Sequence, residues 1–173
     1  MKKQFLLDAV NNSQKISYDP LRGHRIGDHE AGASWFDKDT LTAEDLIKSA
    51  DWKEVKVPGS SDTVKVFQTA IPESIATGHY TMTDLSKFKS IIVEKGLHGN
   101  LEAHSKNSPE GATIECETQL ATIIVVNEDN TWLAATAYPG EYEPLPNMDG
   151  LKDGQEISVD EALERGIRRV KIA

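Results

Sequence analysis

The stretch from residue 113 to residue 140 constrains the fold most strongly. Its sequence, TIECETQLATIIVVNEDNTWLAATAYPG, contains two apolar runs separated by a polar segment. These near-continuous apolar runs, at 121–126 and 132–135, indicate two strands over residues 113–126 and 131–138. The polar residues 127–130, NEDN, are typical of a tight turn, so the segment predicts an antiparallel hairpin. Because both runs are almost continuously apolar, we expect both strands to be central in a sheet.

The clearest helical pattern lies upstream of this hairpin, in TDLSKFKSIIVEKG at residues 83–96. Its apolar residues recur at the spacing of one helix face: Leu85, Phe88, Ile91 and Ile92. Gly96 is a favourable residue for ending a helix. We therefore predict a helix here, followed by a polar loop over residues 96–112.

Shorter elements are predicted on both sides of this region. A short helix is expected at residues 3–11, and Thr42 and Ser158 are N-cap residues followed by acids in the first turn of two further helices. Alternation of polar and apolar residues predicts strands at 53–57 and 63–71. The final residues, IRRVKI, predict an edge strand whose basic side chains guard the open edge.

Together these signals predict an α+β fold in which N-terminal helices pack against a small antiparallel β-sheet with a central hairpin. Beyond its first helix, the segment 1–35 contains three glycines and shows neither helical nor strand periodicity. We expect it to form an N-terminal arm or subdomain. Residues 36–173 are expected to form a single α+β domain.

Composition narrows the class of protein. The net charge of −9 at pH 7 argues against a general nucleic-acid binder, which needs clustered lysine and arginine. No apolar run approaches the length of a membrane span, and the first residues lack the apolar core of a signal peptide, so we expect no membrane partner. Cys116 is the only cysteine, which excludes an internal disulfide and fits a reducing cytoplasm. A cytoplasmic location is therefore expected.

Charge is distributed unevenly along the chain. Lys152 is the only lysine or arginine between residues 107 and 164, whereas aspartate and glutamate are frequent there. Basic residues lie mostly before this stretch and again directly after it. One face is therefore predicted to be acidic. The 107–164 region is either an ordinary solvated surface or a docking surface for a basic protein partner.

Side chains suited to acid–base chemistry lie in the predicted loop and at the exit of the hairpin. The loop holds His98, His104 and Lys106, while Thr136 and Tyr138 are two residues apart on one strand face. Cleavage of RNA without a metal needs a base for the 2′-hydroxyl, an acid for the leaving oxygen and donors for the charged phosphorane. Histidine suits the first two roles because it titrates near neutrality. The alternative is solvated loop histidines beside a packed strand-end tyrosine.

A helix, a histidine-containing loop and a hairpin whose last strand ends in TAYPG resemble the barnase–EndoU–colicin–RelE superfamily of metal-independent ribonucleases. The resemblance covers about residues 79–140, and the likeness is greatest to variants that occur as toxin domains in phage and contact-dependent inhibition proteins. It implies an endoribonuclease that uses histidine, a basic residue, and Ser/Thr with Tyr on the sheet. In this chain those roles fall on these residues: His98 or His104, Lys106, Thr136 and Tyr138.

Two further clusters carry polar side chains. HRIGDHE, at residues 24–30, holds metal-competent side chains, but its two glycines disfavour a helix that would align them, and we expect a polar loop with no metal and no other cofactor. His79 and Tyr80 precede the predicted helix at residue 83, whose free N–H groups attract anions. They are therefore ligand-binding candidates, or part of an ordinary turn. The sequence contains no GxGxxG, GxxxxGK[ST] or GxSxG motif.

The sequence thus supports two functional hypotheses and leaves open whether the protein is an enzyme. The first is a ribonuclease-like protein that cleaves RNA without a metal, with histidine as general acid or base. The second is a non-catalytic acidic interaction protein, of a phage or bacterial accessory or immunity type, that binds a basic partner. A concave site that unites histidine, lysine, threonine and tyrosine would favour the first. A contiguous acidic or apolar surface would favour the second.

Overall fold

The computed structural model places helices and antiparallel sheets together, which confirms the α+β class. It describes residues 2–27, 34–57, 62–96, 99–107 and 109–172. The described strands form three sheets, so the expectation of a single small sheet is wrong. Contacts divide the chain into two compact units: unit 1 is Met1–Tyr80 with Cys116–Tyr142, and unit 2 is Thr81–Glu115 with Glu143–Ala173. The predicted division into an arm of residues 1–35 and one domain of residues 36–173 stays a prediction.

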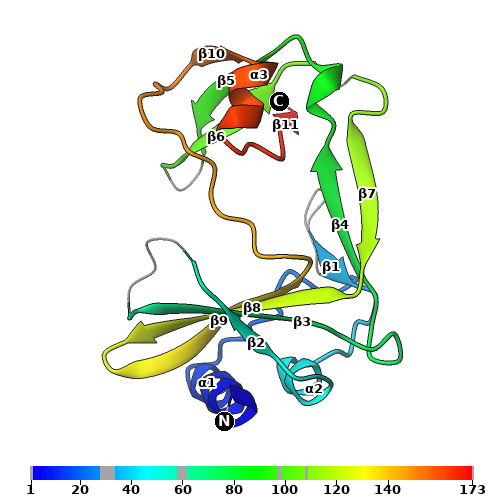
Figure 1. The fold of residues 1–173 in the computed structure, drawn as a ribbon, viewed down its shortest axis with the longest axis vertical. Helices are drawn as coiled ribbons and strands as arrows, with labels where there is room; N and C mark the ends of the chain where they lie inside the picture. Colours follow the sequence, from blue (N-terminus) through cyan, green and yellow to red (C-terminus); the bar gives the residue numbers. More distant parts are fainter. Residues whose placement is uncertain (1, 28–33, 58–61, 97–98, 108, 173) are drawn as a thin grey trace. The chain divides into compact units, whose positions relative to one another are not determined.

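Unit 1 contains an antiparallel sheet in the order β2–β3–β8–β9 (Figure 1). Its strands are β2 (Lys53–Val55), β3 (Val64–Ala70), β8 (Leu120–Glu128) and β9 (Thr131–Pro139). Strands β8 and β9 confirm the predicted hairpin, and they pair from Glu128 and Thr131 onward. Asp129 and Asn130 have φ values of 52° and 65°, the left-handed conformation that a two-residue hairpin turn requires. Strand β8 is interior as expected, whereas β9 is an edge strand.

Helix α1 (Lys2–Lys15) protects the open edge of β9. The Ser13 hydroxyl donates a hydrogen bond to the Ala134 carbonyl at 3.0 Å, and the Asn12 amide donates one to the Trp132 carbonyl, also at 3.0 Å. These bonds use carbonyl groups that an unpaired edge strand would leave to solvent. The helix therefore both closes the edge and contributes to the core.

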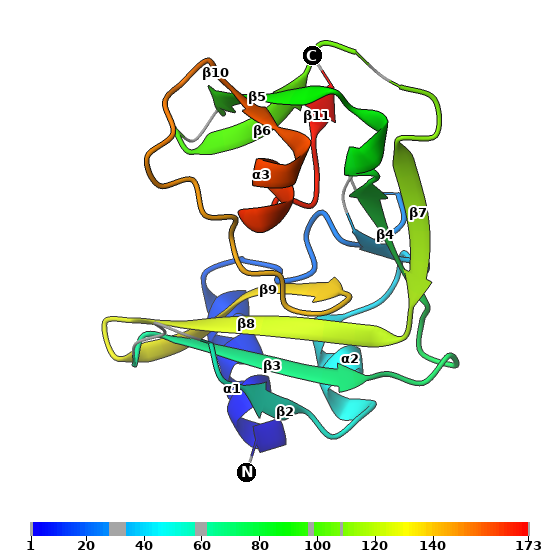
Figure 2. The same cartoon turned by 45° about the horizontal axis from the view of Figure 1, so that its top comes forward.

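The core of unit 1 lies between the helices and the sheet (Figure 2). Helix α2 (Ala43–Lys48) begins with the predicted cap at Thr42, which exchanges hydrogen bonds with Asp45. The fully buried apolar side chains come from both helices and from the sheet: Leu6, Ala9, Leu46, Ile47, Ile123 and Val125. The packing of N-terminal helices against a sheet is therefore confirmed within unit 1.

A second sheet, β1–β4–β7, consists of β1 (Trp35–Phe36), β4 (Gly78–Thr83) and β7 (Thr113–Thr118). The boundaries between the two units fall within β4 and β7. Because Gln119 separates β7 from β8, the single strand predicted over residues 113–126 is two strands belonging to different sheets. The Gln119 side chain donates to the carbonyl groups of Ile71 and Ala76, which anchors the connection.

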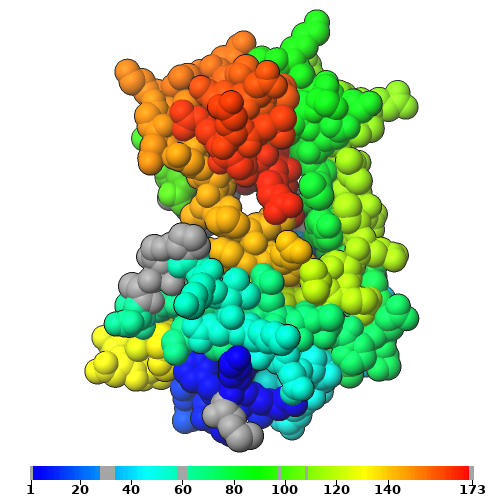
Figure 3. All heavy atoms as spheres, viewed as in Figure 1, coloured from blue at the N-terminus to red at the C-terminus, as the bar shows by residue number. Residues whose placement is uncertain are grey.

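Unit 2 is built on a sheet in the order β10–β5–β6–β11. Its strands are β5 (Ser90–Lys95), β6 (Leu101–Ser105), β10 (Gln155–Ser158) and β11 (Lys171–Ile172), and only β11 runs parallel to its neighbour. Helix α3 (Val159–Glu164) starts at the predicted cap Ser158. The strand predicted over residues 167–172 is confirmed as an edge strand only for its last two residues, which form β11. In Figure 3 the orange and red atoms of the C-terminal part of this unit lie against the green atoms of its first part.

The predicted helix at residues 83–96 is wrong. Leu85 and Phe88 are buried, as the predicted helix required. However, Leu85 lies in a single turn of 3-10 helix, η1 (Leu85–Lys87), and Phe88 caps the end of that turn. The following residues form β5, where Ile91 and Val93 are both fully buried. A run of β-branched residues that pairs with strands on both sides is more stable in the sheet than it would be in an isolated helix. Likewise, the predicted loop 96–112 contains strand β6.

Among the described residues, no helix is long and apolar enough to cross a membrane.

Candidate functional site

The predicted catalytic residues belong to different units. His104 lies in β6 and Lys106 just after it, so both are in unit 2. Thr136 and Tyr138 lie in β9, which is part of unit 1. His98 is outside the described residues. No single unit therefore contains the predicted set, and its catalytic role stays a prediction.

His104 lies between two carboxylates on the sheet of unit 2. Its Nδ1 is 3.9 Å from Glu94 Oε2, and its Nε2 is buried 3.5 Å from Glu102 Oε2. The same Glu102 oxygen lies 2.7 Å from Lys171 Nζ. The hydrogen bond from Lys171 is the main reason why the pKa of the Glu102 carboxyl is below its usual value. The side chains of Glu94, His104, Glu102 and Lys171 therefore link the adjacent strands β5, β6 and β11.

In unit 1 the structure places a different histidine beside the predicted tyrosine. The ring centroids of His24 and Tyr138 are 6.0 Å apart, and His24 Nδ1 lies 2.9 Å from the Ser34 carbonyl oxygen. His24 belongs to the HRIGDHE segment, whose residues 28–30 are outside the described residues. No group of three potential metal ligands occurs among the residues that the structure describes. Because His24 and Tyr138 are far apart in sequence, no local pattern could have paired them.

The other two candidates, His79 and Tyr80, lie in β4 and not in front of a helix. The His79 ring stacks on Trp35 with centroids 5.5 Å apart and 12° between the ring planes. The register of β1 and β4, which places Trp35 opposite His79, positions both rings. The anion-binding helix end on which their ligand-binding role depended is absent, because β4 continues through residue 83.

Unit 2 contains an open groove of about 900 Å³, which we call the apolar groove. Three large apolar side chains on it are exposed to solvent: Ile114 (44%), Leu145 (90%) and Leu163 (57%). They come from β7, from the loop after β9 and from α3, and buried Leu85 and Ile167 complete the lining. Exposed leucines are unremarkable singly, but these three apolar side chains converge on one groove from separate segments of the chain.

The rim of the apolar groove carries three acidic residues, Asp84, Asp160 and Glu164, and two arginines, Arg165 and Arg168. Asp160 and Glu164 are exposed and have no ion-pair partner among the described residues. The Asp84 carboxylate accepts hydrogen bonds from the hydroxyl and N–H groups of Ser86, which lower its pKa and keep it ionised.

The two arginines on the same rim are engaged by other groups. Arg165 donates to the carbonyl groups of Asn147 and Asp149, each at 2.9 Å. Arg168 lies 3.7 Å from Glu143. The groove therefore presents an apolar floor and a net acidic rim.

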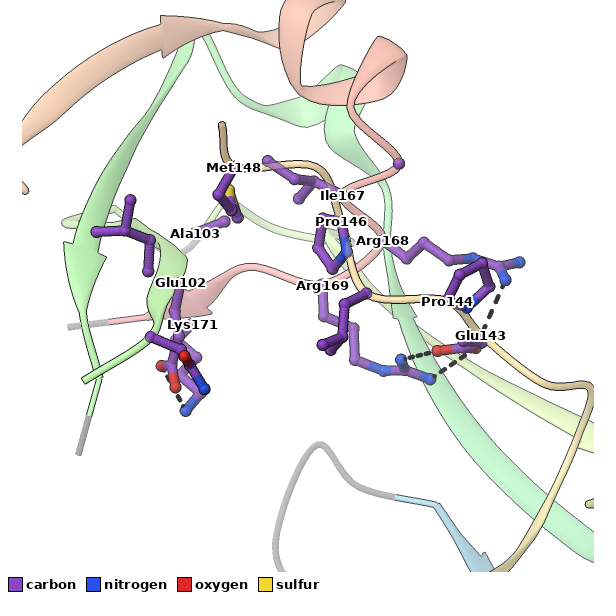
Figure 4. Close-up of a pocket in the computed structure, with 14 residues that line it drawn as sticks. Glu102, Ala103, Glu143, Pro144, Pro146, Met148, Ile167, Arg168, Arg169 and Lys171 are labelled. Atoms are coloured by element: carbon purple, nitrogen blue, oxygen red, sulfur yellow. Dashed lines mark hydrogen bonds and ion pairs between the residues drawn. The ribbon is translucent and has the colours of Figure 1, made fainter. Parts of the chain in front are cut away.

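A second, smaller pocket of about 360 Å³ lies beside the groove (Figure 4). The two hollows share residues 144–145 and 166–168. Arg168, Arg169 and Lys171 line the smaller pocket, together with apolar Met148 and Ile167. We call it the basic pocket.

Sequence reasoning missed both hollows. The acidity of residues 107–164 was visible, and a leucine between two prolines in the segment EPLP is a sign of an exposed apolar residue. The basic residues near the C-terminus were interpreted only as guards of an edge strand. The residues that line the two hollows are brought together by the pairing of β10, β5, β6 and β11. Sequence periodicity did not predict this pairing.

No protein-family model, curated protein or solved structure matches this chain.

Proposed function

We propose that this protein is an interaction module that binds an amphipathic, basic segment of a protein partner in the apolar groove of unit 2. The observation that carries the proposal is the convergence of exposed Ile114, Leu145 and Leu163 on one groove. The occupant has an apolar face that covers these side chains. Its flanking lysines or arginines pair with the acidic rim formed by Asp160 and Glu164.

Burial supplies the affinity in this proposal. Removing one leucine side chain fully from water contributes about 1.5–3 kcal/mol. Leu145 and Leu163 both retain most of their surface for a partner to cover. Rim carboxylates add less to affinity than burial does, but they select the sign of the partner's charge and speed association. The acidic rim thus gives a physical basis for the basic-partner hypothesis.

A labelled probe peptide tests the proposal. We would measure the fluorescence anisotropy of an amphipathic helical peptide with leucines on one face and lysines on the other. The double variant Leu145→Ser/Leu163→Ser should bind at least about tenfold more weakly, because each lost leucine contact corresponds to more than 1 kcal/mol. The matched control is Ile16→Ser, which removes an exposed apolar side chain (63%) from unit 1. It should bind like the wild type.

The acidic rim has its own test. The double variant Asp160→Lys/Glu164→Lys should weaken binding of the lysine peptide and strengthen binding of a peptide that carries glutamates instead. Equal binding of both peptides to the wild type would contradict the charge argument. Equal losses in the leucine variant and in Ile16→Ser would contradict the assignment of the groove.

We also propose metal-independent RNA cleavage as a second candidate function, because the ring centroids of His24 and Tyr138 lie 6.0 Å apart. Tyr138 is one of the residues to which the ribonuclease resemblance gives a role, and a histidine beside it would supply the acid or base. Purified protein would be incubated with total RNA in EDTA. Cleavage that survives chelation and falls in His24→Ala and Tyr138→Phe, but not in His104→Ala, would support this candidate. Intact RNA at high protein concentration would contradict it.

A further inference from the structure

We infer that the basic pocket of unit 2 is a binding site for a dianionic phosphate group, and that the Glu143 carboxylate occupies this site in the unliganded protein. The inference concerns Arg168 and Arg169, of which Arg168 also lines the apolar groove. Figure 4 shows both guanidinium groups directed at the single carboxylate of Glu143.

The geometry at Arg169 is that of an oxyanion receptor. Its two terminal nitrogens each donate a hydrogen bond to a different oxygen of Glu143, and the bond from Nη2 to Oε1 measures 3.2 Å. Its Nε donates to the Thr81 carbonyl at 2.8 Å, which fixes the plane of the guanidinium group. Such a held, planar fork matches the oxygens of a carboxylate or a phosphate.

Charge balance favours a ligand with more negative charge than a carboxylate. Arg168 Nη1 lies 3.7 Å from Glu143 Oε1, so two arginines share one negative charge. The third cation, Lys171, is neutralised by Glu102 at 2.7 Å. The arginine pair thus retains one uncompensated positive charge, which a phosphate dianion neutralises and a carboxylate does not.

The surroundings indicate which phosphates fit. Met148, Pro146 and Ile167 form an apolar wall on the pocket, and Ile167 is almost fully buried. The Arg168, Arg169 and Glu143 side chains are 45%, 37% and 24% exposed, so the site is accessible to a ligand. Because these side chains are partly buried, salt weakens their attraction to an anion less than it would on an open surface. An ester of phosphate with a small apolar group would place the phosphate at the arginines and the apolar group against this wall.

Glu143 competes with any external anion because it belongs to the same chain and acts at a high effective concentration. The wild type is therefore expected to bind phosphate weakly. Removing the carboxylate should expose the site. Calorimetric titration with inorganic phosphate, at constant ionic strength set by sodium chloride, should show binding to Glu143→Gln at least about tenfold tighter than to wild type.

Two further variants make the test specific. Glu128→Gln changes the net charge by the same amount, but Glu128 is an exposed residue of unit 1, so this variant should bind phosphate like the wild type. Adding Arg169→Gln to Glu143→Gln should abolish the gain. Phenyl phosphate should bind Glu143→Gln more tightly than inorganic phosphate does, and benzoate more weakly than phenyl phosphate.

The inference is overturned if Glu143→Gln binds phosphate no more tightly than Glu128→Gln, or if the gain survives Arg169→Gln. Should Glu143→Gln fail to fold, the side-chain N–H signals of the wild-type arginines would be followed by NMR during a phosphate titration. Selective shifts of Arg168 and Arg169 would support the site. Uniform shifts of all arginines would overturn it.

Discussion

Substitution of Gly78 by alanine should destabilise unit 1, because a side chain at this position has no room. Gly78 lies in β4, and a Cβ atom there would be 2.2 Å from the Cβ of Pro139 and 3.2 Å from the carbonyl oxygen of Thr118. One neighbour belongs to a proline ring and the other to the backbone, so neither can move aside cheaply. Overpacking of this kind costs about 1–3 kcal/mol, and the overlap places Gly78→Ala at the upper end. The lower entropy of the unfolded alanine chain offsets about 0.4–1 kcal/mol.

The expected net loss is therefore about 2–2.6 kcal/mol in the free energy of unfolding. Urea unfolding followed by tryptophan fluorescence suits this measurement, because all three tryptophans, Trp35, Trp52 and Trp132, belong to unit 1. The midpoint should fall without a change in slope.

Gly96→Ala provides the contrast. A Cβ atom at Gly96 would lie 2.1 Å from Glu102 Oε1, which is the end of a flexible side chain. The carboxylate can turn away at the cost of its partly exposed ion pair, so the loss should stay below about 1 kcal/mol, measured by far-UV circular dichroism. Equal losses in Gly78→Ala and Gly96→Ala would refute the reasoning that the rigidity of the neighbour decides the cost.

Three other perturbations have defined outcomes. Ser13→Ala removes a buried donor from the Ala134 carbonyl and should cost about 1–3 kcal/mol, measured by urea unfolding with tryptophan fluorescence; an unchanged midpoint would contradict this role for the hydrogen bond. Thr42→Ala removes the cap of α2 and should cost about 1 kcal/mol in the same assay, whereas Thr42→Ser should cost much less. Because the folded-state pKa of Glu102 is lowered, its stabilisation is present above its ordinary pKa and is lost as the pH falls through the folded pKa. Glu102→Gln should therefore flatten the acid side of the thermal stability profile, and an unaltered profile would argue against the contact with Lys171.

The parts of the fold that sequence predicted correctly are those where local signals and tertiary packing agree. The β8–β9 hairpin has apolar strands and a turn whose asparagine and aspartate tolerate left-handed backbone. The caps at Thr42 and Ser158 are local hydrogen bonds that need no distant partner. Such elements can be predicted because their stabilising contacts lie within a few residues.

Residues 83–96 show where this reasoning fails. The predicted helical stripe is Leu85, Phe88, Ile91 and Ile92, whereas the buried set contains Val93 in place of Ile92. Strand β5 pairs with β6 on one side and with β10, some sixty residues later, on the other. A pattern that fits both a helix face and a strand cannot be decided without knowledge of those partners.

The candidate sites were harder to predict than the fold, because each one combines distant segments. The apolar groove needs Ile114, Leu145 and Leu163 together, and the proximity of His24 to Tyr138 joins the first part of the chain to the hairpin. The charge pattern of residues 107–164 predicts an acidic face, and two residues of the rim, Asp160 and Glu164, come from that region. It could not predict the exposed apolar floor within that surface, which gives the docking hypothesis its physical basis.

Methyl NMR of the full chain with the lysine-bearing amphipathic peptide tests the central claim most directly. The described exposed isoleucines and leucines lie both inside the groove (Ile114, Leu145 and Leu163) and outside it (Ile16 and Ile26). If the groove is the docking site, the methyl signals of the first three residues shift as the peptide saturates, while those of Ile16 and Ile26 stay in place. Shifts confined to Ile16 and Ile26, or no shifts at saturating peptide, would contradict the proposed function.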